Sequence, residues 1–459
     1  MPDPASLVRL AVQQRDEGSV LVPSSHATIG HAEYDAKMSE TWGGPLPRLF
    51  PLAVIEFPQQ YASATKRTAL ITGGSGGIGF YVARLLCQVG LAVMIPARPG
   101  LEHEANAAVQ AIMHAVPGAQ VWTPEPPLDL GDFTSVRKFG REMRRSKQRI
   151  DTLVLNAGRG GAAAGSLEAS VDGHELIMQV NLLSHALLTA ELLPLLNRSD
   201  HCRVAAMSSG ARFNVQPTDL QRDLGASIRA VAAAGYSPWA QYSRSKAGAC
   251  LFARGLSKRL AAAHVAGAAS CADPGLAATG VNVQHDLAAT LGGRYPDTKA
   301  LHDRAAHHAA DGALPLARAA LDGADGAIYA HTGGRAGSLS DATARLEPPH
   351  DAARGRRRDT RALSGAGRTL SMDDPAAWPE AVVEAFWARL AEATPGLDEA
   401  WDRWTAMAGG EQEEAEDEAE EEAEEERGPG EQARGKGGIA ADVGHEADGS
   451  RGAQRHDEL

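Results

Sequence analysis

The chain has 459 residues, of which 43% are hydrophobic and 5% aromatic, and its formal net charge is −13. Residues 411–459 hold 18 acidic and 5 basic residues, so the first 410 residues carry no net charge. A neutral body without a basic stripe argues against a nucleic-acid-binding protein. The 49 glycines and the scarcity of aromatic residues favour an α/β fold with tight turns over an all-β sandwich.

Targeting signals at the two ends of the chain disagree. The first 30 residues lack a secretory apolar core, because Arg9 interrupts LVRLAV, and no apolar run approaches the roughly 18 residues of a membrane span. A cytoplasmic protein without a transmembrane segment is therefore expected. The last four residues, His456–Leu459, read HDEL, the form of a retention signal of the endoplasmic reticulum, which favours the lumen instead.

The cysteines give no sign of a metal site. Their spacing matches no set of metal ligands; two of them lie among apolar residues on expected helices, and a third lies on an expected strand. We expect buried free thiols and no bound metal. The four residues are Cys87, Cys202, Cys250 and Cys271.

Short apolar runs alternate with helical patterns from Thr68 onward. This alternation predicts parallel strands joined by right-handed crossovers, and hence a doubly wound α/β sheet, the Rossmann fold. The longest helix is expected to have Asp172 as its N-cap. Strands are expected at 68–72, 91–97, 119–123, 151–155, 203–208 and 265–272, and helices at 77–89, 103–115, 133–145, 172–197 and 240–263.

The flanking regions are less regular. Residues 1–65 contain Pro and Gly clusters and are expected to form an irregular N-terminal extension, followed by one catalytic domain over 66–400. Within that domain, 313–321 and 376–393 look helical, and 330–372, rich in Gly, Arg and Ser, is predicted to be a loop insertion. Residues 401–459 are expected to be a disordered acidic tail, because 12 of the 16 residues in 411–426 are acidic.

A glycine-rich turn carries the first chemical signal. TGGSGGIG at Thr72–Gly79 follows the first expected strand and opens a helix. Backbone N–H groups at such a turn can approach a pyrophosphate closely, whereas a side chain would obstruct the approach or the turn itself. We therefore expect a dinucleotide-binding turn formed by Gly73, Ser75, Gly77, Ile78 and Gly79.

The spacing TGxxxGxG resembles the short-chain dehydrogenase/reductase family, and further motifs follow in the family's order. They are NAG at Asn156–Gly158, MQVNLLSHALLTAELLPLL at 178–196, MSS at 207–209, YSRSK at Tyr242–Lys246 and PGLAAT at Pro274–Thr279. The resemblance covers residues 66–282 firmly and 283–400 loosely. DGHELIMQVNLLSH and the 33-residue gap between Ser209 and Tyr242 resemble the retinol-dehydrogenase-like branch.

Tyr242 and Lys246 are four residues apart on an expected helix and so share one face. An unperturbed phenol has a pKa near 10, and a neighbouring ammonium group is expected to lower it towards neutrality. The resemblance implies that Lys246 also holds the nicotinamide ribose, that Ser209 binds the substrate oxygen, and that Asn181 organises a proton relay through Lys246. Structural alternatives stay open: Ser209 could merely end a strand, and Asn181 could cap or bridge in the core.

The end of the second strand bears on the choice of cofactor. It reads MIPARPG, with Arg98 and no acidic residue before Glu102. An acid there would bind a ribose hydroxyl and favour NAD(H), whereas a guanidinium suits a 2′-phosphate, so NADP(H) is favoured unless Arg98 simply faces solvent. The resemblance implies further cofactor contacts from Asp129, Asn156, Ala157, Gly158, Pro274 and Thr279. WTPEPP at 122–127 is an unusual insertion that could shift Asp129.

Together these patterns favour an NADP(H)-dependent oxidoreductase that interconverts a carbonyl and an alcohol, with Tyr242 as proton donor or acceptor. The branch resemblance suggests a lipophilic small-molecule substrate, and the family often forms homo-oligomers. Two alternatives remain. One is a non-catalytic NADP-binding scaffold that acts through its acidic tail, and the other is an NADPH-dependent reductase of enone C=C bonds. The residues do not specify the substrate or the direction of the reaction.

Overall fold

A computed structural model describes the central part of the chain. The chain divides into two compact units, Met1–Ala408 and Gly409–Leu459. The acidic tail, its HDEL ending and nearly all of the expected N-terminal extension lie outside the described residues. Those residues are 57–58, 61, 67–160, 167–196, 199, 202–224, 226, 228–275, 277, 279, 307–323, 326–330, 344–345 and 378–407.

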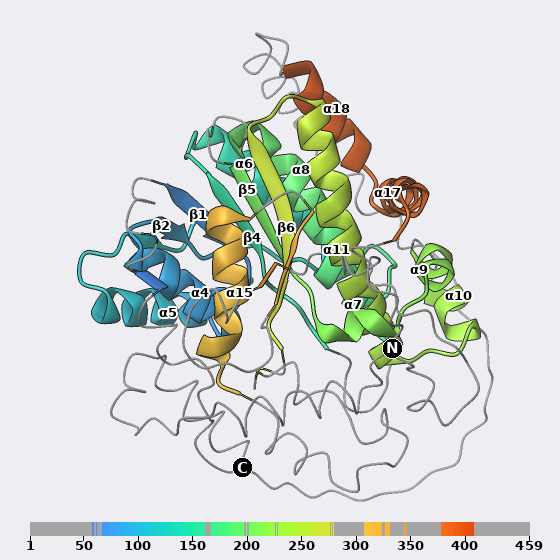
Figure 1. Cartoon of the computed structure of the whole chain (residues 1–459), viewed down its shortest axis with the longest axis horizontal. Coiled ribbons are helices and arrows are strands. Elements are labelled where there is room, and N and C mark those ends of the chain that lie inside the picture. The colour runs from blue at the N-terminus through green and yellow to red at the C-terminus, as the bar shows by residue number, and fades with distance from the viewer. Residues whose placement is uncertain are drawn as a thin grey trace, which may run out of the picture. The chain divides into compact units, whose positions relative to one another are not determined.

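A single eight-stranded sheet forms the centre of the described part (Figure 1), with the strand order β3-β2-β1-β4-β5-β6-β7-β8. Neighbouring strands are parallel from β3 to β7, and β8 runs antiparallel to β7. The predicted doubly wound sheet is confirmed. The strands are β1 Thr68–Ile71, β2 Ala92–Met94, β3 Val121–Trp122, β4 Thr152–Leu155, β5 Cys202–Met207, β6 Gly267–Asp273, β7 Ile328–Ala330 and β8 Ala344–Arg345.

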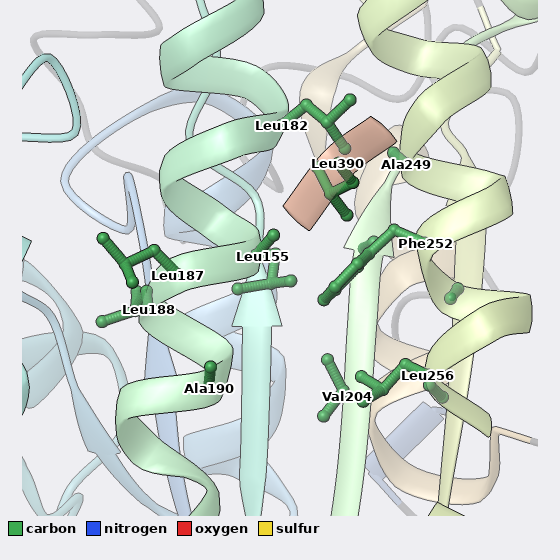
Figure 2. Close-up of a cluster of buried hydrophobic side chains, with 14 of the residues drawn as sticks. Leu155, Leu182, Leu187, Leu188, Ala190, Val204, Ala249, Phe252, Leu256 and Leu390 are labelled. Atoms are coloured by element: carbon green, nitrogen blue, oxygen red, sulfur yellow. The ribbon is translucent and has the colours of Figure 1, made fainter. Parts of the chain in front are cut away.

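The strands read as short continuous apolar runs because both faces of the sheet are covered. On β4, Leu153 and Leu155 point into one hydrophobic cluster while Val154 points into the other. Figure 2 shows the first cluster, where Leu155 and Val204 of the sheet meet Leu187 and Phe252 from the helices. Residues from one short strand therefore stabilise two separate helical layers.

In the part of the chain that the structure describes, helices cover both faces of the sheet. Residues of the first hydrophobic cluster come from α6 Phe133–Arg145, α8 Ser184–Leu196 and α11 Pro238–Ala262. Residues of the second come from α4 Gly77–Gln88, α5 Glu102–Ala115 and α15 Ala309–Asp322. The shorter helical segments are η3 Gly210–Asn214, α9 Pro217–Asp223 and α10 Ile228–Ala233.

The helix expected at 172–197 is a composite that starts later. It comprises α7 Leu176–Met178, a π-helical turn at Gln179–Leu183, and α8. The prediction of Asp172 as the N-cap was wrong: Glu175 accepts the bond from the Met178 N–H at 2.9 Å. Asp172 instead accepts a hydrogen bond from the Phe133 N–H at 2.9 Å, a tertiary contact that sequence spacing does not reveal.

Three further features differ from the sequence-based expectations. The stretch 330–372, predicted to be a loop, contains β8 at Ala344–Arg345, paired through its backbone with β7; the rest of that stretch beyond Ala330 lies outside the described residues. Phe57, within the expected irregular extension, is fully buried in the second cluster. The helix α18 Leu397–Met407 runs across the domain boundary expected at residue 400.

A helix near the C-terminal end of the described residues packs beside α11. The Trp387 ring, from α17 Glu380–Ala393, stacks on Phe252 of α11 with centroids 5.5 Å apart. Among the described residues, one helical span, Leu176–Leu196, is long and apolar enough to cross a membrane, but 89% of it is buried inside the protein. Such burial is typical of a core helix of the fold.

Candidate active site

A cavity of about 1000 Å³ opens at the carboxyl ends of the central strands. The chain order of the sheet reverses between β1 and β4, and ligands of open parallel sheets bind beside such a switch point. Most of the residues that the sequence singled out line this cavity. They are Gly73, Ser75, Gly77, Ile78, Arg98, Asp129, Asn156, Ala157, Gly158, Ser209, Tyr242, Lys246, Pro274 and Thr279.

The glycine-rich turn between β1 and α4 is shaped for close approach by an anion. Gly73 and Gly77 have φ angles of 64° and 54°, in the left-handed region that favours glycine. The N-cap of α4, Gly76, makes no side-chain capping bond, and the first turn holds no acidic residue. The N–H groups that open α4 therefore lack a side-chain cap and suit a phosphate group.

Gly79 is not among the residues that line the cavity, but a side chain there would obstruct the turn itself, which is one of the two roles predicted for it. A Cβ atom at this position would lie 2.2 Å from the Gly73 carbonyl oxygen and 2.4 Å from Asn156 Nδ2. The absence of a side chain lets α4 pack directly against the turn. Gly79 therefore determines the shape of the glycine-rich turn without lining the cavity.

Thr72 and Asn156 lock the loops after β1 and β4 together. The Thr72 hydroxyl oxygen accepts hydrogen bonds from the N–H groups of Asn156 and Ala157, both at 3.0 Å. Asn156 Nδ2 donates to the carbonyl oxygens of Thr72 at 3.0 Å and Gly73 at 3.1 Å. Thr72 was not among the predicted site residues, although its place at the start of the turn motif was a usable signal.

His185 contacts the Thr72 hydroxyl and so supports the connection between the two loops. It was also not among the predicted site residues. Burial lowers the pKa of His185 to about 3, so the ring is neutral. Its Nδ1 lies 3.3 Å from the Asn181 carbonyl oxygen, which can only accept, so Nδ1 carries the proton. Nε2, 3.0 Å from the Thr72 hydroxyl, then accepts a hydrogen bond from it. The presence of a polar residue, His185, in an otherwise apolar helix was a sequence signal that could have identified it.

Ser209, Tyr242 and Lys246 converge on one wall of the cavity. The Tyr242 phenol and the Ser209 hydroxyl are hydrogen-bonded, and Lys246 Nζ lies 5.6 Å from the centre of the Tyr242 ring. Ser209 also caps η3, accepting from the Ala211 N–H at 3.2 Å. The alternative that Ser209 merely ends a strand is therefore incomplete, since its hydroxyl also contacts the phenol.

The expectation that Lys246 lowers the pKa of Tyr242 was wrong for this arrangement. Burial raises the pKa of Tyr242 to about 12, and the Ser209 hydrogen bond only partly offsets this. The Lys246 ammonium donates to the Met207 carbonyl oxygen at 3.1 Å. Burial lowers the pKa of Lys246 to about 8, so at neutral pH the phenol is protonated and most of the lysine is charged.

Asn181 lies behind the cavity wall and does not line it. Its side chain bonds the Arg159 backbone, accepting from the N–H at 2.8 Å and donating to the carbonyl oxygen at 3.1 Å, and donates to Ser245 Oγ at 3.0 Å. These contacts fit the bridging alternative, because they tie the loop after β4 to α11. The relay through Lys246 stays a prediction.

Arg98 and Asp129, the residues expected beside the adenosine, both line the cavity. Arg98 is exposed and lines the cavity just after β2. Asp129 Oδ1 accepts a hydrogen bond from the Gly131 N–H at 2.8 Å, which fixes the carboxylate locally. The WTPEPP insertion therefore leaves Asp129 within the cavity lining.

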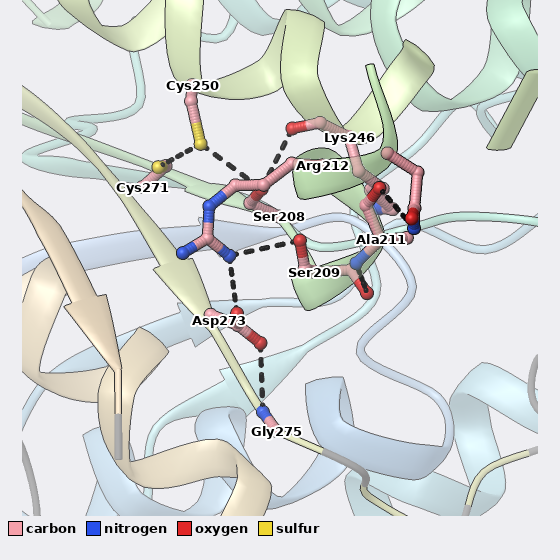
Figure 3. Close-up of polar contacts among 10 residues, drawn as sticks. Ser208, Ser209, Ala211, Arg212, Lys246, Cys250, Cys271, Asp273 and Gly275 are labelled. Carbon is pink, nitrogen blue, oxygen red and sulfur yellow. Dashed lines mark hydrogen bonds and ion pairs between the residues drawn. The ribbon is translucent and has the colours of Figure 1, made fainter. Parts of the chain in front are cut away.

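A buried ion pair joins the helical turn after β5 to the end of β6 (Figure 3). Arg212 and Asp273 are paired, and Arg212 Nη1 also donates to the Ser209 carbonyl oxygen at 3.0 Å. Asp273 Oδ1 accepts from the Gly275 N–H at 3.0 Å. The pair thus links the Ser209 turn to the loop that begins at Pro274. Sequence patterns do not reveal this pair, because its partners are 61 residues apart.

Comparisons with known proteins agree on one family. A family profile described as short chain dehydrogenase matches residues 67–219. The short chain dehydrogenase yanD of Aspergillus niger is 30% identical over 231 residues, covering 48% of this chain and 68% of that relative. A rhamnolipids biosynthesis 3-oxoacyl-[acyl-carrier-protein] reductase of Pseudomonas aeruginosa is 34% identical over 207 residues, covering 45% of this chain and 71% of the relative.

Mouse (Mus musculus) polyprenol dehydrogenase is 32% identical over 219 residues, covering 46% of this chain. The chain spans 60% of the length of that relative, less than two thirds.

The Arg212–Asp273 pair yields a prediction about stability. Arg212→Met should lower the free energy of unfolding by about 3–5 kcal/mol, because it leaves a buried carboxylate without its partner. Asp273→Asn should also be destabilising, and the double variant should recover a large part of the summed loss. Chemical denaturation measures all three.

A matched control is the exposed pair Arg389–Glu392, where Arg389→Met should cost less than about 1 kcal/mol. If Arg212→Met costs no more than Arg389→Met, the buried pair does not hold the two loops together.

Proposed function

The chain belongs to the short-chain dehydrogenase family, and on that premise we propose that it is an NADP(H)-dependent oxidoreductase that interconverts a carbonyl and an alcohol. One observation carries the proposal: Ser209, Tyr242 and Lys246 meet on the wall of the cavity that the glycine-rich turn also lines. An anion cradle and a hydrogen-bonded pair of hydroxyls in one cavity suit a dinucleotide beside a small polar group.

The residues present fit a nicotinamide dinucleotide. The N–H groups at the start of α4 would hold the pyrophosphate, Asp129 would bond the adenine, and Lys246 would hold the nicotinamide ribose. Arg98 would pair with the 2′-phosphate that distinguishes NADP(H). The cofactor, when bound, supplies or accepts the hydride.

Tyr242 and Ser209 would handle the substrate oxygen. Their hydroxyls lie within hydrogen-bonding distance of each other, so one carbonyl oxygen can accept from both. The raised pKa keeps the phenol protonated at neutral pH, as a proton donor must be in carbonyl reduction. As negative charge grows on the oxygen, Tyr242 gives up its proton and the Lys246 ammonium stabilises the phenolate.

A lipophilic carbonyl compound is the proposed substrate class. The lining of the cavity also includes the apolar residues Val171, Leu176, Val180 and Met207. Val171 is 79% exposed, so an apolar side chain stands at the solvent side of the lining. The relatives named for polyprenol and for 3-oxoacyl groups point to the same class.

The catalytic assignment is tested by NADPH oxidation with a panel of long-chain aldehydes and ketones. Tyr242→Phe and Lys246→Ala should lower kcat by at least about 100-fold, because each removes part of the proton transfer. Ser209→Ala should cost about 10²-fold through loss of the second donor to the oxyanion.

Tyr236→Phe is the matched control, because the Tyr236 hydroxyl bonds Glu175 at 3.1 Å and lies outside the cavity lining. It should leave kcat within about threefold, well short of the loss expected for a general acid. Equal kcat values for Tyr236→Phe and Tyr242→Phe would remove Tyr242 from the chemistry.

The cofactor assignment makes a separate prediction. Arg98→Ala should weaken NADPH binding by about 10- to 100-fold, the worth of a charge-assisted hydrogen bond, and leave NADH binding nearly unchanged. Isothermal titration with both cofactors measures the ratio. Arg229→Ala, which removes an exposed arginine of α10, is the control. An unchanged NADPH-to-NADH affinity ratio in Arg98→Ala would contradict a role for Arg98 in cofactor choice.

A further inference from the structure

Two cysteines meet where α11 packs on β6. The Sγ atoms of Cys250 and Cys271 are 2.6 Å apart (Figure 3), and each residue is 1% exposed. None of the four cysteines forms a disulfide bond in this structure. A small movement would bring these two sulfurs to the length of a disulfide bond, about 2.05 Å.

The pair sits directly behind the candidate catalytic wall. Tyr242 and Lys246 precede Cys250 by eight and four residues on α11, so all three lie along one side of the helix. Cys271 lies two residues before Asp273 on β6 and therefore faces the same side of the sheet. A bond between the sulfurs would join the helix of the proposed acid–base residues to the strand that leads to Pro274.

We propose that Cys250 and Cys271 are a site of covalent modification, forming an intrachain disulfide that fixes α11 to β6. The reactant would be a low-molecular-weight disulfide such as oxidised glutathione. One cysteine thiolate attacks a sulfur of the reactant, forming a mixed disulfide and releasing one glutathione thiol. The thiolate of the second cysteine then attacks the sulfur of the first cysteine, which forms the Cys250–Cys271 bond and releases the second glutathione thiol.

The exchange balances. Two protein thiols lose two electrons and two protons, and one glutathione disulfide gains them to become two thiols. Because both sulfurs are buried in the fold, the exchange takes place before α11 seats on the sheet or during local opening of that contact.

The other two cysteines cannot substitute. Cys87 lies in the hydrophobic cluster on the opposite face of the sheet. Cys202 pairs in register with Gly267, four residues before Cys271, so it lies about 13 Å along the sheet from Cys271.

The bond should act on stability more than on catalysis. It would close a loop between residues 21 apart, which restricts the unfolded chain. The Cys250 thiol now donates to Ser208 Oγ at 3.1 Å, and Ser208 donates to the Lys246 carbonyl oxygen at 2.8 Å. Oxidation would remove the first contact and keep the second, so the α11 backbone beside Lys246 stays anchored.

The test is peptide mapping of the full-length protein after equilibration with oxidised glutathione, either folded or during refolding of the reduced chain. Free thiols are then alkylated under denaturing conditions, and the protein is digested with trypsin without reductant. Cys250 falls in the peptide 247–254 and Cys271 in 260–294, whereas Cys87 and Cys202 fall in other peptides. We expect the first two peptides to be linked and to separate on reduction.

Single alanine variants supply the matched controls. Cys250→Ala and Cys271→Ala should abolish the link, and Cys87→Ala and Cys202→Ala should keep it. Reduction should lower Tm by several degrees in the parent and leave Cys250→Ala unchanged. The proposal would be overturned if all four cysteines were completely alkylated both in the folded sample and in the refolded sample. It would also be overturned if disulfide links to Cys87 or Cys202 were as frequent as the link between Cys250 and Cys271. No substrate is needed, so the result is independent of the proposed activity.

Discussion

The close seating of α11 against its neighbours is the contact on which the rest of the site depends. It is possible because glycine replaces a side chain where the helix is most crowded. A Cβ atom on Gly248 would lie 2.5 Å from Leu182 Cδ2, and one on Gly255 would lie 2.7 Å from Trp387 Cε3. With α11 held this close, Tyr242 and Lys246 reach the carboxyl edge of the sheet beside Ser209.

Loops at that edge are held by polar bonds where the backbone leaves the sheet. Thr72 and Asn156 join the loops after β1 and β4, and Asn181 ties the second of these loops to α11. The Arg212–Asp273 pair links the loops after β5 and β6. The cavity is therefore enclosed by loops fixed to a rigid sheet, as a site that orients two reactants requires. Burial of the same wall sets the protonation states of Tyr242 and Lys246.

Local patterns were sufficient for the element types and for most of the cavity lining. TGGSGGIG and YSRSK each place their residues within one turn or helix, so spacing alone indicates a shared location. Contacts between distant segments were beyond this reasoning: the Arg212–Asp273 pair, strand β8 and the later start of the helix at Leu176 all depend on tertiary packing. The pKa of Tyr242 was misjudged for the same reason, because burial raises it and sequence spacing does not reveal that burial.

Isotope transfer from cofactor to substrate tests the central claim most directly. The enzyme is incubated with NADPH carrying deuterium on the transferable position of C4 and with a long-chain enone, and the product is examined by mass spectrometry and NMR. The account predicts deuterium on the carbinol carbon of an allylic alcohol. Deuterium on the β-carbon of a saturated ketone would instead identify a C=C reductase. NADPH binding without transfer to any carbonyl substrate would contradict the proposed catalysis and favour a cofactor-binding scaffold.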